Sequence, residues 1–362
     1  MPTSSSVPSV QSLGDLLFIG FDGTELTVDL REFLLAVRPG GIILFKRNIL
    51  DAHQTLRLIA GLKGIYEPAP IIAVDEEGGQ VSRLRPLAPT LPPMARLAAS
   101  HNTETVRQGA AALGGVLSSL GFDMDFAPVV DLCRPDAPNG IGDRSFGLDP
   151  EAVASLAGAY LDGLAEAGIV GCLKHFPGLG PTLFDSHYHV PSVTKAEAAF
   201  RAEDLLPYQR LHSRVPVIMI GHGHYPFFAG PDPIAATLTP AVSTGLLRET
   251  IGFCGVALAD DLEMKAVAAR MSWSELAPRV IAAGCDMALV CRNRDAIGAS
   301  LRALGEWVSS FRLDPARVTQ ALDRVVALRQ AVAAAAARRN APSDEAFHAA
   351  CAVLSERVAA IG

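Results

Sequence analysis

The sequence predicts an α/β fold, a (β/α)8 TIM-type barrel in a single domain with a C-terminal helical extension. Short apolar runs alternate with amphipathic stretches over about 330 of the 362 residues, which is typical of strands that alternate with helices. The runs lack polar–apolar alternation, as expected of parallel strands buried on both faces. Eight such runs occur, at residues 16–21, 41–45, 70–74, 123–127, 169–175, 217–221, 255–259 and 287–291.

A doubly wound open sheet is the alternative fold, because hydrophobic periodicity does not distinguish an open sheet from a closed barrel. The dinucleotide-binding version of that fold carries a G-x-G-x-x-G motif after its first strand. No such motif follows the first apolar run of this chain, and we therefore favour the barrel.

The predicted helices are marked by their ends. Residues 151–168 have apolar side chains at helical spacing and end in Gly168. Thr194 and Glu197 form the T-x-x-E pattern of a capping box, which predicts that a helix begins there. Further helices, each with a Pro at its start or a Gly at its end, are predicted at residues 240–252, 274–284 and 315–339.

The barrel domain is expected to span residues 1–337. The segment 338–343 (RRNAPS) is typical of a short linker, and residues 344–361 form an amphipathic pattern. We therefore expect residues 338–362 to form a linker and a C-terminal helix that packs on the barrel.

The composition excludes several classes of protein. Hydrophobic residues make up 49% of the chain and charged residues 19%, which is typical of a globular fold rather than a disordered chain. The net charge is −7 and no basic stripe stands out, so we expect no nucleic-acid partner. No apolar run approaches the roughly 18 residues that span a bilayer, so we expect no membrane partner.

The N-terminal stretch MPTSSSVPSVQSLGD has neither the basic nor the apolar region of a signal peptide, so we expect a cytoplasmic protein. The six cysteines include no C-x-x-C pair, which argues against disulfides and against a cysteine metal site. Four of them lie in or beside apolar runs, where we expect small buried thiols: Cys172, Cys254, Cys285 and Cys291.

Polar residues gather directly after several predicted strands. In a barrel the carboxyl ends of the strands meet on one face, and that face holds the active site. The loops at the opposite ends carry no comparable group, and the sequence therefore predicts an enzyme. The gathered residues include Asp75, Glu76, Glu77, Gln80, Arg83, Asp131, Asp143, Arg144, Lys174, His175, Asp185, His187, His189, His222, His224, Asp260 and Asp261.

Two features of this group suggest catalysis. Asp260 directly follows a buried strand, where a carboxylate is suited to act as a nucleophile, a base or a metal ligand. The plain alternative is that Asp260 or Asp261 caps the following turn.

Asp185 and His187 stand two residues apart, and a carboxylate beside an imidazole orients the ring and prepares it to give and take a proton. The alternative there is a solvated loop with an incidental histidine.

The remaining charged residues suit a ligand rich in hydroxyl groups. Charged donors and acceptors with few aromatic neighbours are expected to bind hydroxyls, whereas no glycine-rich loop of the kind that cradles phosphate is evident. These residues are Asp75, Arg83, Arg144, Lys174 and His175.

Taken together, these motifs resemble those of the family 3 glycoside hydrolases, and among them the β-N-acetylhexosaminidases of bacterial peptidoglycan recycling. The likeness runs in order along the chain to about residue 335. The segments that carry it are VDEEGGQVSRLR (74–85), FAPVVDL (126–132), IGDRSFG (141–147), KHFPGLG (174–180), DSHYHVP (185–191), ADDLEM (259–264) and AGCDMALVC (283–291). The family pattern usually has His where this chain has Leu179, and often Arg where it has Gln80.

The resemblance implies a role for each matching position. Asp260 matches the catalytic nucleophile, His187 the acid/base, and Asp185 its partner in a dyad. Asp75, Arg83, Arg144, Lys174 and His175 match positions that bind the non-reducing N-acetylglucosamine. The implied reaction is a retaining hydrolysis through a covalent glycosyl–Asp260 intermediate, without a cofactor or a metal. The implied partner is a small-molecule substrate, a muropeptide or disaccharide that contains N-acetylglucosamine, and we expect a monomer.

Three other functions remain open from the sequence. A metal-dependent hydrolase on the same barrel could use the H-x-H pairs His187/His189 and His222/His224 as Zn²⁺ ligands. A histidine acid/base is also compatible with phosphate as the acceptor, which would make the enzyme a phosphorolytic glycosidase. A sugar-binding protein without activity is the third, although the nucleophile and dyad positions are all filled.

Overall fold

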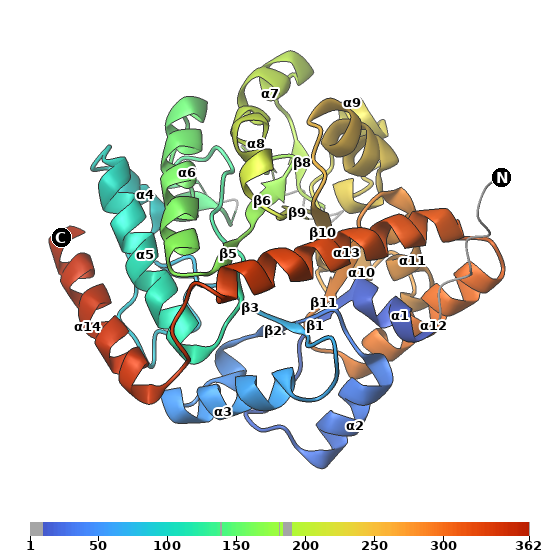
Figure 1. Cartoon of the computed structure of the whole chain (residues 1–362). Coiled ribbons are helices and arrows are strands. Elements are labelled where there is room, and N and C mark those ends of the chain that lie inside the picture. Colours follow the sequence, from blue (N-terminus) through green and yellow to red (C-terminus); the bar gives the residue numbers. More distant parts are fainter. Residues whose placement is uncertain (1–9, 138–139, 181, 184–189, 362) are drawn as a thin grey trace.

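The strands of the main sheet form a closed barrel in which every hydrogen-bonded pair of strands is parallel (Figure 1). The structure is a computed structural model that describes residues 10–137, 140–180, 182–183 and 190–361. The strand order is β5-β4-β3-β2-β1-β11-β10-β9-β6. The bounds are β1 (Leu17–Ile19), β2 (Gly41–Leu44), β3 (Ile71–Val74), β4 (Met124–Asp125), β5 (Val170–Gly171), β6 (Leu173–Phe176), β9 (Val217–Ile220), β10 (Val256–Asp261) and β11 (Met287–Val290).

The sheet closes because its first and last strands are two parts of one segment. Only Cys172 separates β5 from β6, and β5 pairs with β4 while β6 pairs with β9. The predicted (β/α)8 fold is therefore confirmed, and the open doubly wound sheet is excluded. The predicted strand at residues 169–175 is interrupted at Cys172, and the one at 123–127 is shorter than predicted.

Helices cover the outside of the barrel (Figure 1). Most connections hold one or two of them, and the connection after β9 also holds a π-helix, η6 (Ala241–Thr250). The α-helices are α1 (Val10–Leu13), α2 (Val28–Val37), α3 (Ala52–Lys63), α4 (Met94–Ala98), α5 (Thr103–Leu120), α6 (Pro150–Glu166), α7 (Glu197–Glu203), α8 (Leu206–Leu211), α9 (Pro226–Ala229), α10 (Lys265–Ala268), α11 (Trp273–Ala283), α12 (Arg294–Ser309), α13 (Pro315–Ala336) and α14 (Asp344–Ile361).

Two local predictions were wrong. Helix α7 begins at Glu197 after the N-cap Ala196, which makes no side-chain cap, so Thr194 stands too far upstream to form a capping box. Cys254 is exposed rather than buried, because it lies in the irregular segment before β10 and not in the strand. All six cysteines are free thiols.

Successive residues of each strand serve two different cores, as strand geometry requires. In β3, Ile72 and Val74 pack outward against the helices, whereas Ile71 and Ala73 point into the barrel. Bulky residues from the other strands fill the interior, including Met219 of β9. The barrel is therefore packed rather than hollow, and only its rim is left for a site.

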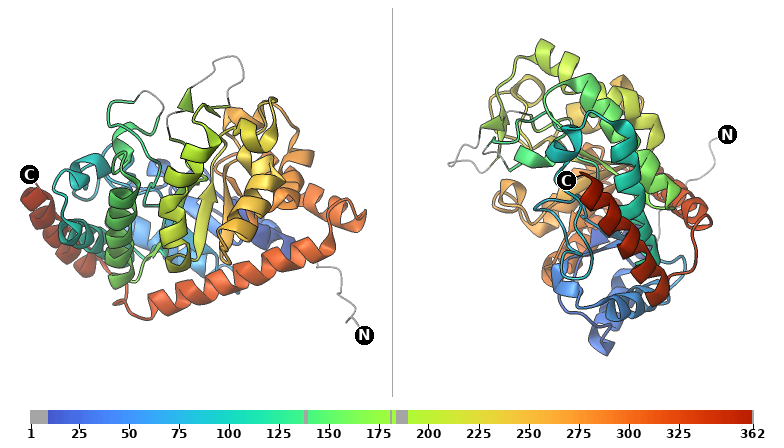
Figure 2. Two further views of the ribbon diagram at one scale, coloured as in Figure 1. Left: turned by 90° about the horizontal axis from the view of Figure 1, so that it is seen from above. Right: turned by 90° about the vertical axis from the view of Figure 1, so that its left-hand side faces the viewer.

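The opposite end of the barrel also carries buried charge, which the sequence did not predict. Asp286 is fully buried directly before β11 and accepts hydrogen bonds from Arg248, Arg317 and Arg324. Two of these arginines lie on α13, which runs across this end of the barrel (Figure 2). The arginines come from remote segments, so the local sequence around Asp286 does not reveal the cluster.

Helix α14 packs along α5 at the edge of the barrel (Figures 1 and 2). Its buried side chains are Phe347 and Leu354, which join the outer core. Within the described ranges, no helix is both long enough and apolar enough to cross a bilayer.

Candidate active site

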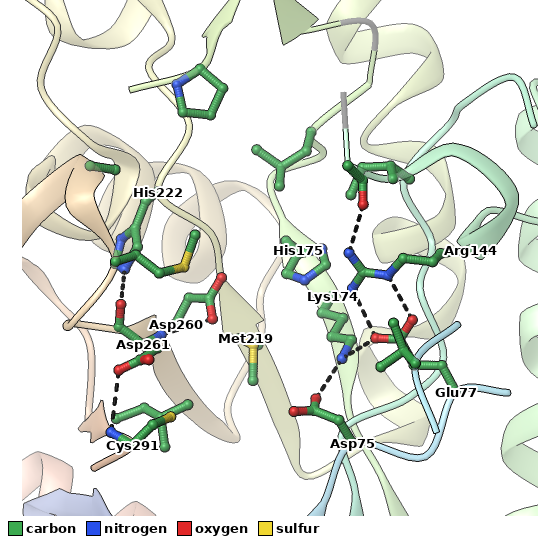
Figure 3. A pocket seen from close by; sticks show the side chains of 18 of the residues that line it. Asp75, Glu77, Arg144, Lys174, His175, Met219, His222, Asp260, Asp261 and Cys291 are labelled. Atoms are coloured by element: carbon green, nitrogen blue, oxygen red, sulfur yellow. Dashed lines mark hydrogen bonds and ion pairs between the residues drawn. The ribbon is translucent and has the colours of Figure 1, made fainter. Parts of the chain in front are cut away.

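One pocket of about 620 Å³ opens at the carboxyl ends of the barrel strands (Figure 3). Met219, Ile43 and Leu289 give it an apolar floor. Six of the eight predicted site residues line it: Asp75, Arg83, Arg144, Lys174, His175 and Asp260. The structure therefore brings together side chains that are spread from residue 75 to residue 260.

The other two predicted residues, Asp185 and His187, lie outside the described residues, as does His189. They belong to the segment between β7 (Thr182–Leu183) and β8 (Ser192–Val193), which pair as an antiparallel ribbon. Thr182 and Pro191 stand on either side of the segment, and both line the pocket. The described residues on both sides of this segment therefore lie at the pocket.

One wall of the pocket is a chain of alternating charges. Nζ of Lys174 lies 2.8 Å from Oδ1 of Asp75 and 2.5 Å from Oε1 of Glu77. The guanidinium of Arg144 binds both oxygens of Glu77, with Nε and Nη2 each 2.8 Å from an oxygen. Such two-pronged pairs fix geometry as well as charge. Figure 3 shows the four side chains side by side on this wall.

Glu77 and Lys174 are almost completely buried, and their ionisation depends on each other. Burial alone would raise the pKa of the Glu77 carboxyl, but the positive charges of Lys174 and Arg144 outweigh it and lower that pKa to about 2. Burial would lower the pKa of Lys174, but Asp75 and Glu77 raise it above its ordinary value. Both groups are therefore charged at neutral pH.

The loop after β3 folds back so that Arg83 returns to Asp75, with Nη2 3.5 Å from Oδ2. Glu76 secures this turn, because its carboxylate accepts hydrogen bonds from the backbone N–H groups of Arg83 (2.6 Å) and Leu84 (2.9 Å). Gly78 has a φ of 92° and lies against backbone carbonyls, so only glycine fits there without strain.

His175 is held from behind by Asp131. The Asp131 carboxylate is fully buried and also accepts a hydrogen bond from the backbone N–H of Leu179 at 2.7 Å. Since a carboxylate only accepts, the Nδ1 that faces it carries the proton, and Nε2 is left for the pocket.

Asp260 lies at the end of β10, on the side of the pocket opposite the charged wall. Its carboxylate points toward the middle of the pocket, whereas that of Asp261 turns away toward Cys291 (Figure 3). Asp261 accepts hydrogen bonds from the backbone N–H groups of Glu263 (3.0 Å) and Cys291 (3.3 Å). Burial raises the pKa of Asp261 to about 6. The two neighbouring carboxylates thus have different surroundings: Asp260 faces the ligand space and Asp261 fastens the turn.

The histidines of the second H-x-H pair are engaged by the protein itself. His222 contacts Oγ1 of Thr237 through Nδ1 (2.8 Å) and the backbone oxygen of Asp261 through Nε2 (3.0 Å). His224 likewise uses both ring nitrogens, toward Ser192 and the backbone oxygen of Gly230. Among the described residues, no group of three or more His, Cys, Asp or Glu side chains is arranged to hold a metal ion.

The residue pattern predicted no role for Glu77 or Asp131, and for His222 only that of a Zn²⁺ ligand in the metal-dependent alternative. Glu77 stands in the run Asp75-Glu76-Glu77, and spacing does not reveal that Glu76 binds backbone while Glu77 binds two cations. The available signal was chemical: a buried lysine such as Lys174 requires a counter-charge and acceptors for its other N–H groups.

The Asp260 carboxylate faces the pocket, and its Oδ1 accepts a hydrogen bond from the backbone N–H of Asp261 at 2.8 Å. Such a carboxylate, opposite rigid donors and acceptors over an apolar floor, is suited to a polyhydroxy ligand that undergoes attack at one carbon. A (β/α)8 barrel with this arrangement is typical of glycoside hydrolases.

Comparisons with known proteins give the family. The model described as the glycosyl hydrolase family 3 N terminal domain matches residues 11–328. A beta-hexosaminidase from Alkalilimnicola ehrlichii is 37% identical over 306 residues, which cover 82% of this chain and 87% of the relative. The chain belongs to glycosyl hydrolase family 3, and both the predicted family and the predicted enzyme class, glycoside hydrolase, are confirmed.

Solved structures agree with this assignment. The family 3 β-N-acetylglucosaminidase from Paenibacillus sp. str. FPU-7 superposes with a TM-score of 0.87 at 32% identity, over 98% of this chain and 69% of that one. NagZ from Neisseria gonorrhoeae, solved in complex with N-trifluoroacetyl-D-glucosamine, gives a TM-score of 0.75 at 31% identity, over 96% of this chain and 98% of that one.

Proposed function

We propose that this enzyme is a retaining exo-β-N-acetylglucosaminidase that removes the non-reducing terminal N-acetylglucosamine from peptidoglycan fragments. The observation that carries the proposal is the position of Asp260, which faces the pocket from β10 opposite the wall formed by Asp75, Glu77, Arg144 and Lys174. The names of the relatives, beta-hexosaminidase and β-N-acetylglucosaminidase, support the choice of sugar.

In the proposed reaction, the charged wall and His175 bind the sugar hydroxyls and hold the ring over the apolar floor. A carboxylate oxygen of Asp260 attacks C1 and forms an ester, while the glycosidic bond breaks and His187 gives a proton to the departing oxygen. His187 then takes a proton from a water molecule, which attacks C1 and releases Asp260. Asp185 orients the imidazole throughout.

Two features of the proposed context go beyond the reaction. The substrate is a muropeptide or disaccharide of the cytoplasm, and the enzyme acts as a monomer. Both are what the family resemblance implies.

A panel of 4-nitrophenyl glycosides tests the proposal. Wild-type enzyme should release nitrophenol from the N-acetyl-β-glucosaminide, and Asp260→Ala should lose activity by about 10³-fold or more while still binding N-acetylglucosamine. The exposed Asp232→Ala is the matched control and should behave as wild type. Near-normal turnover by Asp260→Ala would refute the nucleophile assignment.

The dependence of the rate on the leaving group tests the acid/base role of His187. His187→Ala should slow substrates with basic leaving groups by roughly 10²–10⁴-fold and activated aryl substrates much less, because proton donation matters most when the leaving oxygen is basic. Equal losses on both would count against this role. Assays with added phosphate and with a chelator distinguish hydrolysis from phosphorolysis and from metal catalysis.

A further inference from the structure

The end of β10 that carries Asp260 is not paired with the neighbouring strand β9. The ladder between β9 and β10 runs in register from Val256 and Val217 and ends at the pair Ala259–Ile220. Asp260 and Asp261 lie beyond that last pair, so no strand backbone of β9 supports them.

On its other side, β10 makes an irregular ladder at the same point. Ala259 pairs with Ala288 and Asp261 pairs with Leu289, so β10 uses two steps where β11 uses one. Asp260 is therefore the extra residue of a β-bulge. A bulge turns a side chain out of the regular alternation, and the carboxylate of Asp260 faces the pocket where Asp261 turns away (Figure 3).

His222 occupies the place where the missing ladder would continue. It stands two residues after Ile220, and its Nε2 lies 3.0 Å from the backbone oxygen of Asp261, which stands two residues after Ala259. The imidazole thus replaces the backbone donor that β9 does not supply. Figure 3 shows this contact next to Asp260.

The protonation state of His222 is defined by its partners. A carbonyl oxygen only accepts, so Nε2 carries the proton, and Nδ1 accepts from the hydroxyl of Thr237 at 2.8 Å. Burial lowers the pKa of His222, which favours the same neutral ring. Both ring nitrogens are used by the protein, and neither is left to bind the sugar or to move a proton.

We propose that His222 is a positioning residue, which holds the Asp260 bulge at the end of β10 through its hydrogen bond to the Asp261 carbonyl. This inference rests on the proposed role of Asp260 as the nucleophile. A small displacement of a reacting group lowers the rate steeply, whereas the binding of the sugar by the opposite wall does not depend on this contact.

The test compares two amides that imitate different ends of the imidazole. The nitrogen of Gln at position 222 reaches the position of Nε2 and can donate to the Asp261 carbonyl. The shorter Asn reaches only the position of Nδ1 and can bond only Thr237. The variants His222→Leu, His222→Gln and His222→Asn are assayed with 4-nitrophenyl N-acetyl-β-glucosaminide, with melting temperatures measured on the same samples.

His222→Leu and His222→Asn should lower kcat by roughly 10- to 100-fold, with KM within about threefold of wild type, and His222→Gln should recover most of the loss. The initial burst of nitrophenol, which reports formation of the glycosyl enzyme, should slow by the same factor. The pH profile of His222→Gln should match that of wild type.

Several outcomes overturn the proposal. The first is an unchanged kcat in His222→Leu or His222→Asn, and the second is equal activity of the Gln and Asn variants. The third is a rise in KM as large as the fall in kcat. The fourth is a shift in the pH dependence of kcat in His222→Gln. If His222→Leu does not fold, the comparison of Gln with Asn decides. These outcomes differ from those that would refute the proposed function itself, which are an inactive wild-type enzyme or an active Asp260→Ala variant.

Discussion

Nδ1 of His175 lies 2.7 Å from Oδ2 of Asp131, a carboxylate that is fully buried behind the pocket. The same carboxylate accepts from the backbone N–H groups of His175 (3.3 Å) and Leu179 (2.7 Å). All three of these groups act as donors to Asp131. One buried acid thus fixes both the tautomer of His175 and the backbone that follows it, which makes Asp131 a determinant of how the pocket presents Nε2 to a ligand.

Asp131→Asn should raise KM for 4-nitrophenyl N-acetyl-β-glucosaminide by about 10-fold or more, because an amide must place its NH₂ against at least one of these donors. The control is Asp136→Asn, an exposed carboxylate paired with Arg134 in the same connection, which should leave KM unchanged. An unchanged KM in Asp131→Asn would show that the orientation of His175 is set by other contacts.

Glu77 should make the folded enzyme sensitive to acid. Its pKa in the folded state is about 2, against an ordinary value of 4.5, so the folded form holds the charged carboxylate more strongly than the unfolded chain does. The stabilisation is fully present above about pH 4.5 and is lost as the pH falls through 2. It amounts to about 3 kcal/mol in the free energy of unfolding.

Glu77→Gln should therefore unfold more easily at pH 7, lose less of its stability between pH 5 and pH 2 than wild type, and bind substrate more weakly. Denaturant titrations at several pH values measure the first two effects, and KM measures the third. Glu25→Gln, an exposed glutamate after β1, is the matched control. Parallel stability curves for Glu77→Gln and wild type would contradict the assignment.

The sequence was sufficient to predict the barrel because most strands lie in continuous apolar runs, and polar residues appear at or near the ends of these runs. It was sufficient to group Asp75, Lys174 and Asp260, because the carboxyl ends of parallel strands meet on one face. It did not separate Glu76 from Glu77, since neighbouring residues on a turn point in different directions. It also did not find the partners of Asp286, which lie on η6 and α13 and meet it only in the folded chain.

Asp286 should contribute to stability without affecting catalysis. It lies at the end of the barrel opposite the pocket, is fully buried, and faces three arginines and the backbone N–H of Ala257 (2.9 Å). Asp286→Asn would leave three partly buried guanidinium groups without their fully buried counter-charge, so the free energy of unfolding should fall by about 3 kcal/mol or more.

Thermal melts and KM on the same samples check this separation. KM and kcat per folded molecule should stay at wild-type values. Asp162→Asn, which removes an exposed ion pair with Arg214, should change stability by less than about 1 kcal/mol. A large change in KM for Asp286→Asn would mean that the two ends of the barrel are coupled.

Lys265 should recognise the leaving group of an acidic substrate. It is exposed at the start of α10, lines the pocket, and has no ion-pair partner among the residues that the structure describes. Since it is exposed and also lines the pocket, it lies at the pocket rim, where the leaving group would project toward solvent. In a disaccharide whose leaving group is muramic acid, the lactyl group next to the glycosidic bond carries a free carboxylate, and an exposed ion pair with it is worth about 0.2–1 kcal/mol.

Lys265→Gln should therefore lower kcat/KM for a leaving group with a carboxylate by about two- to fivefold, leave a neutral nitrophenyl substrate unchanged, and reduce the effect of added salt on the acidic substrate. Lys46→Gln is the matched control, because Lys46 is an exposed lysine after β2 that does not line the pocket. Equal losses on acidic and neutral substrates would mean that Lys265 supports the loop rather than the leaving group. No loss on either would remove it from substrate recognition, and any preference for an acidic leaving group would then come from other cations that line the pocket, such as Arg83 and Arg144.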